Sequence, residues 1–157
     1  MSDSLQPIPE GFHTITPYLV VLDAPEAISF YARAFGAVER LRLTDPDGPR
    51  VRHAELEIGD SRLFITDVPL APETKVPNAD DTSPVWLYLY VTDPDSAFDR
   101  AVSAGADVVT PVGDQAWGDR YGCVRDPFGY RWGIASRREN LTKDELTKRM
   151  RTTYADD

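Results

Sequence analysis

The sequence predicts an α+β fold in which two βαβββ modules follow each other and a helix completes the chain. The first observation is a pair of similar helix signals, at residues 21–36 and 91–105, that lie 70 residues apart. The second is the alternation of apolar and polar residues in short segments around them, which has the period of strands. Further matches at the same offset indicate a duplicated module. The matched pairs are Asp23 with Asp93, Ala27 with Ala97, Ile28 with Phe98 and Gly59 with Gly129.

Each of the two helices has start and stop signals. Asp23 can cap the first helix, Pro25 is tolerated in its first turn, and Gly36 suits its end. In the second module Asp93 and Gly105 take the same two roles. We therefore expect one helix in each module, placed between its first and second strands.

Two of the strands have faces of unlike chemistry. In residues 85–91 the odd positions, from Val85 to Val91, are aliphatic, and the even positions carry large rings. In residues 51–58 apolar and polar side chains alternate in the same way. The aliphatic rows are expected to pack under the helices. The opposite face carries rings and charged groups, which suit a ligand pocket better than a hydrophobic core. That face would hold His53, Glu55, Trp86, Tyr88 and Tyr90.

The remaining segments set the module boundaries. Residues 68–84 contain four prolines and no periodicity, which predicts a linker between module one at about 12–67 and module two at about 85–136. After the second module, Thr142 and Glu145 form a capping box and basic residues fill the last turn. This pattern predicts a C-terminal helix at about 141–152, packed on the domain or on a dimer mate.

Composition limits the classes of function. The 157 residues, 41% of them hydrophobic, fit a single globular domain. The chain has 17 Lys and Arg against 26 Asp and Glu, and this net charge of −9 does not favour nucleic acid or an anionic membrane. No apolar stretch approaches the roughly 18 residues of a membrane span, and the polar start is unlike a signal peptide. We expect a cytoplasmic protein, and the single cysteine, Cys123, fits a reducing compartment.

Residues 117–132 read as a loop, a strand, a tight DPFG turn and a second strand. Asp126 is expected to cap the turn, because Asp-Pro followed by Gly is typical of turns. Phe128 and Trp132 are expected in the core. Cys123 could be a nucleophile, which needs a nearby base and a lowered pKa, or a small buried side chain, and we expect burial.

These motifs together resemble one superfamily. The first helix reads VxDxxxAIxFYxxAFG and the later hairpin reads GDRxGxxxDPFGxxW, in a chain with an internal repeat. The combination is similar, over residues 8–150, to the vicinal oxygen chelate superfamily, in its glyoxalase/bleomycin resistance family and more narrowly the PhnB-like branch. The resemblance implies two curved mixed sheets, each cupping half of a small-molecule pocket, and usually a homodimer. Such a resemblance settles fold better than function.

The resemblance also implies where a metal ion would bind. Enzymes of the superfamily hold a divalent ion with one ligand from the first strand and one from the last strand of each module, typically two His and two Glu. Three of these positions fall on Thr16, Trp86 and Gly133, and the fourth lies near residues 63–65. None of these is a good metal ligand, so we expect no metal cofactor at the superfamily's site. The positions at which PhnB-like relatives often carry His are occupied by Tyr88 and Tyr130.

A relocated metal site is the alternative. His53 and Glu55 lie two residues apart on a strand and therefore share a face, where Asp67 or His13 could join them. The same side chains could instead hydrogen-bond within a polar face, contact Arg125 or touch a ligand directly. A metal-dependent lyase, isomerase or dioxygenase would require the relocated metal site.

The favoured interpretation is a metal-free protein that binds an aromatic or planar small molecule, of the resistance or sequestration type. No GxSxG elbow, phosphate-binding loop or dinucleotide fingerprint supports another chemistry. In a third interpretation the rings form a dimer contact. Separately, Asp119 and Arg120 could have a purely structural role and fix the loop through a salt bridge. The candidate ligand-binding residues are Tyr18, His53, Glu55, Trp86, Tyr88, Tyr90, Trp117, Arg120, Tyr121, Arg125 and Arg131.

Overall fold

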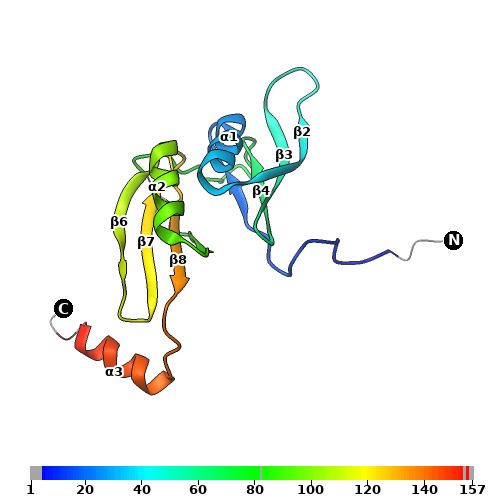
Figure 1. Ribbon diagram of the computed structural model, residues 1–157. Coiled ribbons are helices and arrows are strands. Elements are labelled where there is room, and N and C mark those ends of the chain that lie inside the picture. The colour runs from blue at the N-terminus through cyan, green and yellow to red at the C-terminus, as the bar shows by residue number, and fades with distance from the viewer. Residues whose placement is uncertain (1–4, 82, 154, 156–157) are drawn as a thin grey trace. The chain divides into compact units, whose positions relative to one another are not determined.

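The computed structural model describes residues 5–81, 83–153 and 155. The chain divides into two compact units, residues 1–78 and residues 79–157. Each unit contains one four-stranded mixed sheet with a helix on one of its faces, and neither sheet closes on itself (Figure 1). The predicted α+β fold of two βαβββ modules is confirmed.

The first unit has the strand order β1-β4-β3-β2. Its first strand runs parallel to β4, and the other neighbours are antiparallel. The chain reaches the far edge of the sheet through the helix that separates the first two strands. The elements are β1 (Tyr18–Val20), α1 (Ala24–Phe35), β2 (Val38–Thr44), β3 (Val51–Ile58) and β4 (Ser61–Thr66).

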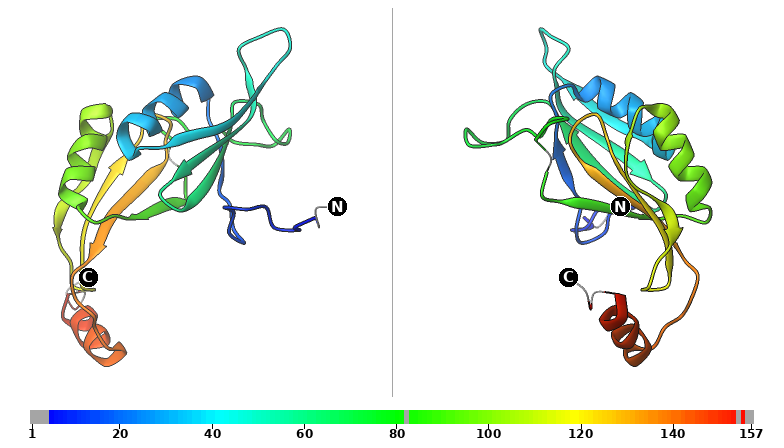
Figure 2. Two further views of the ribbon diagram at one scale, coloured as in Figure 1. Left: turned by 45° about the vertical axis from the view of Figure 1, so that its right-hand side comes forward. Right: turned by 90° about the vertical axis from the view of Figure 1, so that its left-hand side faces the viewer.

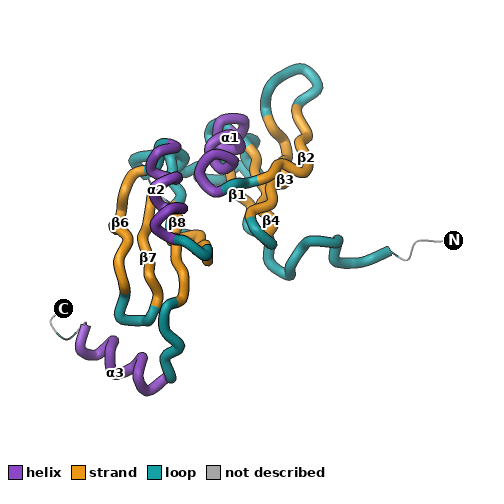
Figure 3. Tube along the Cα trace, in the orientation of Figure 1, coloured by secondary structure: helices purple, strands orange, loops and turns teal. Residues whose placement is uncertain are grey.

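The second unit repeats this topology with the order β5-β8-β7-β6 and adds a C-terminal helix after a loop (Figure 3). Residues 68–81 and 83–84, which precede it, form no strand or helix, and residue 82 of the predicted linker lies outside the described residues. The elements are β5 (Trp86–Tyr90), α2 (Pro94–Ala104), β6 (Asp107–Asp114), β7 (Asp119–Arg125), β8 (Arg131–Arg137) and α3 (Lys143–Thr153).

The helix ends follow the sequence signals. The side chain of Asp23 accepts a hydrogen bond from the Glu26 amide at 3.0 Å, and Asp93 accepts one from the Ser96 amide at 3.1 Å. Each bond satisfies one of the backbone donors that an α-helix leaves unpaired at its start. Gly36 ends α1 with a φ of 68°, in the left-handed region that favours glycine.

The core of the first unit lies between α1 and the sheet (Figure 2). Ala54 pairs with Ile65 and Leu56 pairs with Leu63 across β3 and β4, and all four side chains are buried. These are the apolar positions of the alternating pattern, so the predicted aliphatic row is confirmed here. Full burial of one such large side chain contributes roughly 1.5–3 kcal/mol.

In the second unit α2 packs against β6, β7 and β8. Gly122 makes room for this contact, because a Cβ atom there would lie 2.9 Å from the Phe98 ring of α2. Trp132 and Phe128 are buried as predicted, at 2% and 8% exposure. The prediction was wrong for Val85, which is 58% exposed because it precedes β5, a strand at the edge of the sheet.

Among the residues that the structure describes, no helix is long and apolar enough to cross a membrane. The C-terminal helix α3 begins with the predicted capping box, in which the Thr142 amide donates to the Glu145 carboxylate at 2.8 Å. Arg149 of the same helix makes two hydrogen bonds to Glu139, at 2.7 and 2.8 Å. This pair ties α3 to the segment that leads out of β8.

Candidate functional site

The candidate site is one face of the second sheet. Residues paired across neighbouring strands point to the same side of a sheet, so three rows of side chains cross β5, β8 and β7 on this face. The rows are Trp86 with Arg131 and Arg125, Tyr88 with Gly133 and Cys123, and Tyr90 with Ala135 and Tyr121. Together with Trp117, which packs against Tyr121, these residues form the surface called the ring face below.

The floor of the ring face is made of small residues. Tyr88 and Tyr121 stack over it with their ring centroids 5.5 Å apart and their planes at 17°. A Cβ atom on Gly133 would lie 2.8 Å from the Tyr121 ring and 2.9 Å from the Tyr88 ring. The stack therefore depends on glycine at this position, at which the resemblance described above implies a metal-binding Glu in the enzymes of the superfamily.

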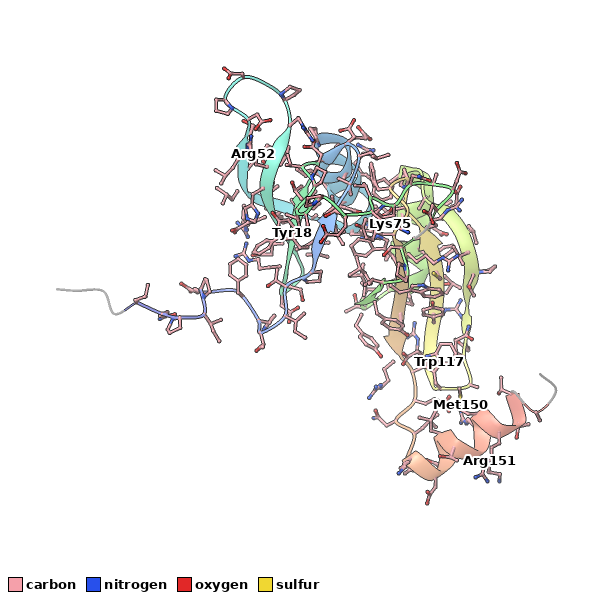
Figure 4. All side chains as sticks on the ribbon, turned by 180° about the vertical axis from the view of Figure 1, so that it is seen from behind. Tyr18, Arg52, Lys75, Trp117, Met150 and Arg151 are labelled. Carbon is pink, nitrogen blue, oxygen red and sulfur yellow. The ribbon has the colours of Figure 1, made fainter. Side chains whose placement is uncertain are left out.

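The upper part of the ring face is open to solvent. Trp86 is 48% exposed, Tyr88 is 45% exposed and Tyr90 is 61% exposed. Large rings gathered on one side of a sheet and left uncovered mark an interaction surface more often than a scattered apolar residue does. Trp117 lies at the end of the β6–β7 hairpin and meets Tyr121 edge-on, with ring centroids 5.6 Å apart (Figure 4).

Asp119 holds the two tyrosine hydroxyls in place. Its Oδ2 atom accepts hydrogen bonds from Tyr88 Oη at 3.0 Å and Tyr90 Oη at 3.1 Å, and the residue is only 4% exposed. Burial, and then the hydrogen bond to Asp119, raise the pKa of Tyr88 to about 12. The Tyr88 hydroxyl thus stays protonated at neutral pH and acts as a donor.

Arg120 does not join the ring face. Neighbours along a strand point to opposite sides, so Arg120 faces away from Asp119, and the predicted pairing between the two does not form. The guanidinium instead meets Asp95 of α2 through two hydrogen bonds of 2.6 Å and Asp114 through one of 3.1 Å. Hydrogen bonds to these two carboxylates raise the pKa of Arg120, and the hydrogen bond from Arg120 lowers the pKa of Asp95. The residue fastens α2 to the sheet.

The other two candidate arginines share the ring face but differ in their partners. Arg125 forms an ion pair with Asp107 at 2.8 Å. The guanidinium carbon of Arg131 lies 5.1 Å from the centroid of the Trp86 ring, within the range of a cation–π contact.

Cys123 lies in the floor beneath the rings and is completely buried, as predicted. Burial raises the pKa of its thiol, which keeps the sulfur protonated. A nucleophilic role would require the opposite shift, so the residue is a packing element of the site.

The candidates of the first unit form a separate polar group. The Tyr18 hydroxyl lies 2.9 Å from His53 Nδ1, and His53 Nε2 lies 3.5 Å from the Glu55 carboxylate. With a proton on Nε2, the histidine accepts from Tyr18 and donates toward Glu55. Phe64 packs edge-on against both rings, with its centroid 4.7 Å from that of His53 and 5.4 Å from that of Tyr18. These contacts hold the imidazole in one orientation.

A cavity of about 600 Å³ lies beside this group. The N-terminal segment, at residues 7–9, 12–14 and 16, forms one wall, and Glu55 and Phe64 form the other. Glu55 therefore connects the hydrogen-bonded group to an open space that a small molecule can enter.

The described side chains at the two candidate metal sites do not fit a divalent metal ion. At the superfamily's four ligand positions stand a hydroxyl, an indole ring, a glycine and the segment 63–65, in place of the expected His and Glu. At the alternative site, Asp67 accepts from the Val51 amide at 2.9 Å and His13 bonds the Asp60 carbonyl at 3.1 Å, so neither joins His53. Within residues 5–81, 83–153 and 155, no group of three or more His, Cys, Asp or Glu can hold an ion.

We expect divalent ions to leave the thermal unfolding of the protein unchanged. An ion that binds only the folded state at 1,000 times its Kd would stabilise it by about 4 kcal/mol, which raises the melting temperature. The measurement is a thermal-shift series with Mg²⁺, Mn²⁺, Fe²⁺, Ni²⁺ and Zn²⁺, run on the native protein and on His53→Ala. A rise in the native protein that disappears in the variant would establish the relocated metal site.

Two residues of the site escaped the sequence analysis. Phe64 lies two residues after Arg62 along β4, so the two side chains share a face of the sheet. A search for period two in residues 61–66 could therefore have placed the Phe64 ring on the polar face. Asp119 was considered only as an ion-pair partner. No sequence signal identifies it as the shared acceptor of Tyr88 and Tyr90, because that role depends on how β5 and β7 flank β8.

Comparison with known proteins gives consistent matches. The family model of the Glyoxalase/Bleomycin resistance protein/Dioxygenase superfamily matches residues 11–134. An uncharacterized protein of Mycobacterium bovis is 43% identical over 139 residues, which cover 87% of this chain and 91% of that one. The crystal structure of TioX from Micromonospora sp. ML1 is 30% identical with a TM-score of 0.64, over 80% of this chain and 98% of TioX. A PhnB protein from Bacillus cereus, at 17% identity and a TM-score of 0.59, shares the fold over 79% of this chain and 99% of its own.

Proposed function

Because the chain belongs to the Glyoxalase/Bleomycin resistance protein/Dioxygenase superfamily, we propose that it binds a planar aromatic small molecule on the ring face without a metal ion. The observation that carries the proposal is the open row of Trp86, Tyr88 and Tyr90 above a floor of small residues. Flat ligands stack on such rings, and the fixed Tyr88–Tyr121 pair offers a rigid platform that loses little entropy on binding.

The enzyme alternative has weaker support. A lyase, isomerase or dioxygenase of this superfamily would need a metal held by His53, Glu55 and at least one further donor, and the neighbouring candidates are engaged elsewhere. The proposed role is therefore sequestration of the ligand, as in resistance proteins. The finer assignment to the PhnB-like branch is part of the proposal and rests on the FYxxAFG and DPFG motifs.

The remaining expectations belong to the same proposal. A homodimer would give the ligand a second wall, and the cytoplasm is the compartment in which a free thiol such as Cys123 remains reduced. The excess of acidic residues supports a small-molecule partner in preference to nucleic acid.

A titration with a planar probe tests the proposed function. We expect naphthalene-2-carboxylate to bind and to quench the tryptophan fluorescence in a saturable way, because Trp86 and Trp117 belong to the ring face. The matched control is decahydronaphthalene-2-carboxylate, which has the same carbon skeleton and charge but no flat ring. Equal affinity for the two compounds, or binding of neither, would contradict stacking on the ring face.

A further inference from the structure

One cation of the ring face has no carboxylate partner in the part of the chain that the structure describes. Arg125, the other cation of the ring face, is neutralised by Asp107, and Arg120 on the opposite face is neutralised by Asp95 and Asp114. Arg131 instead lies over the Trp86 ring. Its Nε atom is buried and donates no hydrogen bond. Buried donors are usually hydrogen-bonded within the protein, so the Arg131 guanidinium is unusual in having a donor without an acceptor in the described structure.

The two ends of the ring face differ in charge and in available donors. Arg131 stands in the Trp86 row, which is one end. At the other end, beyond the Tyr90 row, Asp119 is already occupied by the hydroxyls of Tyr88 and Tyr90. The rows of Trp86 and Tyr90 are four residues apart, or roughly 13 Å along the strand. Neighbouring rows are roughly 7 Å apart, so a ligand of two or three fused rings can lie over the Trp86 and Tyr88 rows while one end reaches the guanidinium.

We propose that the ligand is a planar aromatic carboxylate whose carboxylate binds Arg131. The inference rests on the proposed function, because it names the chemical class of ligand for the same surface. A guanidinium presents its N–H donors as a planar fork that matches a carboxylate, and the flat ring system of the ligand extends the stack of Tyr88 and Tyr121. No ion pair of the described protein has to be broken when Arg131 turns toward such a ligand.

The test compares an acid with its neutral counterpart in three proteins. Naphthalene-2-carboxylate and naphthalene-2-carboxamide are titrated by calorimetry into the native protein, Arg131→Gln and Arg137→Gln. Arg137 is the matched control, since it lies on the same strand, is 64% exposed and stands at the opposite end, 4.0 Å from Asp119. We expect the native protein and Arg137→Gln to prefer the acid by about tenfold or more, and Arg131→Gln to bind both compounds equally.

The outcomes separate this inference from the proposed function. If the native protein binds acid and amide equally, or if Arg131→Gln keeps the preference, the carboxylate inference is overturned while stacking stands. If the native protein binds neither compound, both proposals fail. Arg131→Lys retains the charge without the fork, so it serves as a second variant if Arg131→Gln does not fold, and we expect it to keep only part of the preference.

Discussion

Trp86→Ala should abolish binding of naphthalene-2-carboxylate, whereas His53→Ala should leave most of it. Trp86 contributes a large half-exposed ring at the open edge of the ring face, with the Arg131 guanidinium 5.1 Å from its centroid. Truncation of an aromatic anchor of this kind typically costs about 2–4 kcal/mol, or roughly thirty- to a thousandfold in Kd. Calorimetry is the appropriate measurement, because the substitution itself removes part of the tryptophan fluorescence.

The comparison with His53→Ala makes this result specific. His53 belongs to the other unit, where it bonds Tyr18 and Glu55 beside the 600 Å³ cavity. The exposed position of Trp86 means that its loss should change the free energy of unfolding by only about 0.5 kcal/mol. A loss of binding in His53→Ala with full binding in Trp86→Ala would transfer the site to the cavity of the first unit and end the sequestration proposal.

Local rules explain why so much of the fold was predictable. Asp23 and Asp93 cap their helices through a bond to a backbone amide only three residues away, and Gly36 acts through its own φ angle. The burial of Ala54 and Leu56 likewise follows from strict alternation along one strand. Interactions of this kind involve residues that are close together in the sequence, so the sequence pattern predicts them directly.

The alternation of side chains along a strand also identified the rings of the site, and applying it to β7 would have removed one alternative, the pairing of Asp119 with Arg120. Trp86, Tyr88 and Tyr90 were placed together because every second residue of a strand shares a face. The same rule, applied to β7, puts Asp119 and Arg120 on opposite faces and excludes their pairing. The actual partner of Arg120 is Asp95, 25 residues away on α2, and this contact depends on where the helix packs.

The ion pair of Arg125 with Asp107 is a contact that the internal repeat does not predict. The 70-residue offset places modules in correspondence, but β6 and β7 contain register shifts between Val108 and Thr110 and between Thr110 and Gly113. Irregularities of this kind decide which side chains face each other, and Asp107 thereby comes opposite Arg125. Cross-strand partners are thus set by backbone geometry that a single sequence does not display.

Asp126→Ala should destabilise the second unit by about 3–5 kcal/mol. The Asp126 carboxylate is 1% exposed and accepts from the amides of Phe128 and Tyr130, each at 2.9 Å, and from Trp132 Nε1 at 2.8 Å. Its removal leaves three donors without this acceptor in a region from which water is excluded. Unfolding in urea, followed by circular dichroism, gives the change in the free energy of unfolding.

Two control variants show what this carboxylate does. Asp93→Ala removes an exposed helix cap, for which the expected cost is only about 1 kcal/mol. Asp126→Asn keeps one oxygen for the two amides but turns an NH₂ group toward the indole N–H of Trp132, so its cost should fall between those of the two alanine variants. If Asp126→Ala cost no more than Asp93→Ala, the turn would be stable without its buried acceptor. The DPFG motif would then owe its form to proline and glycine, and Asp126 would have no structural reason to be buried there.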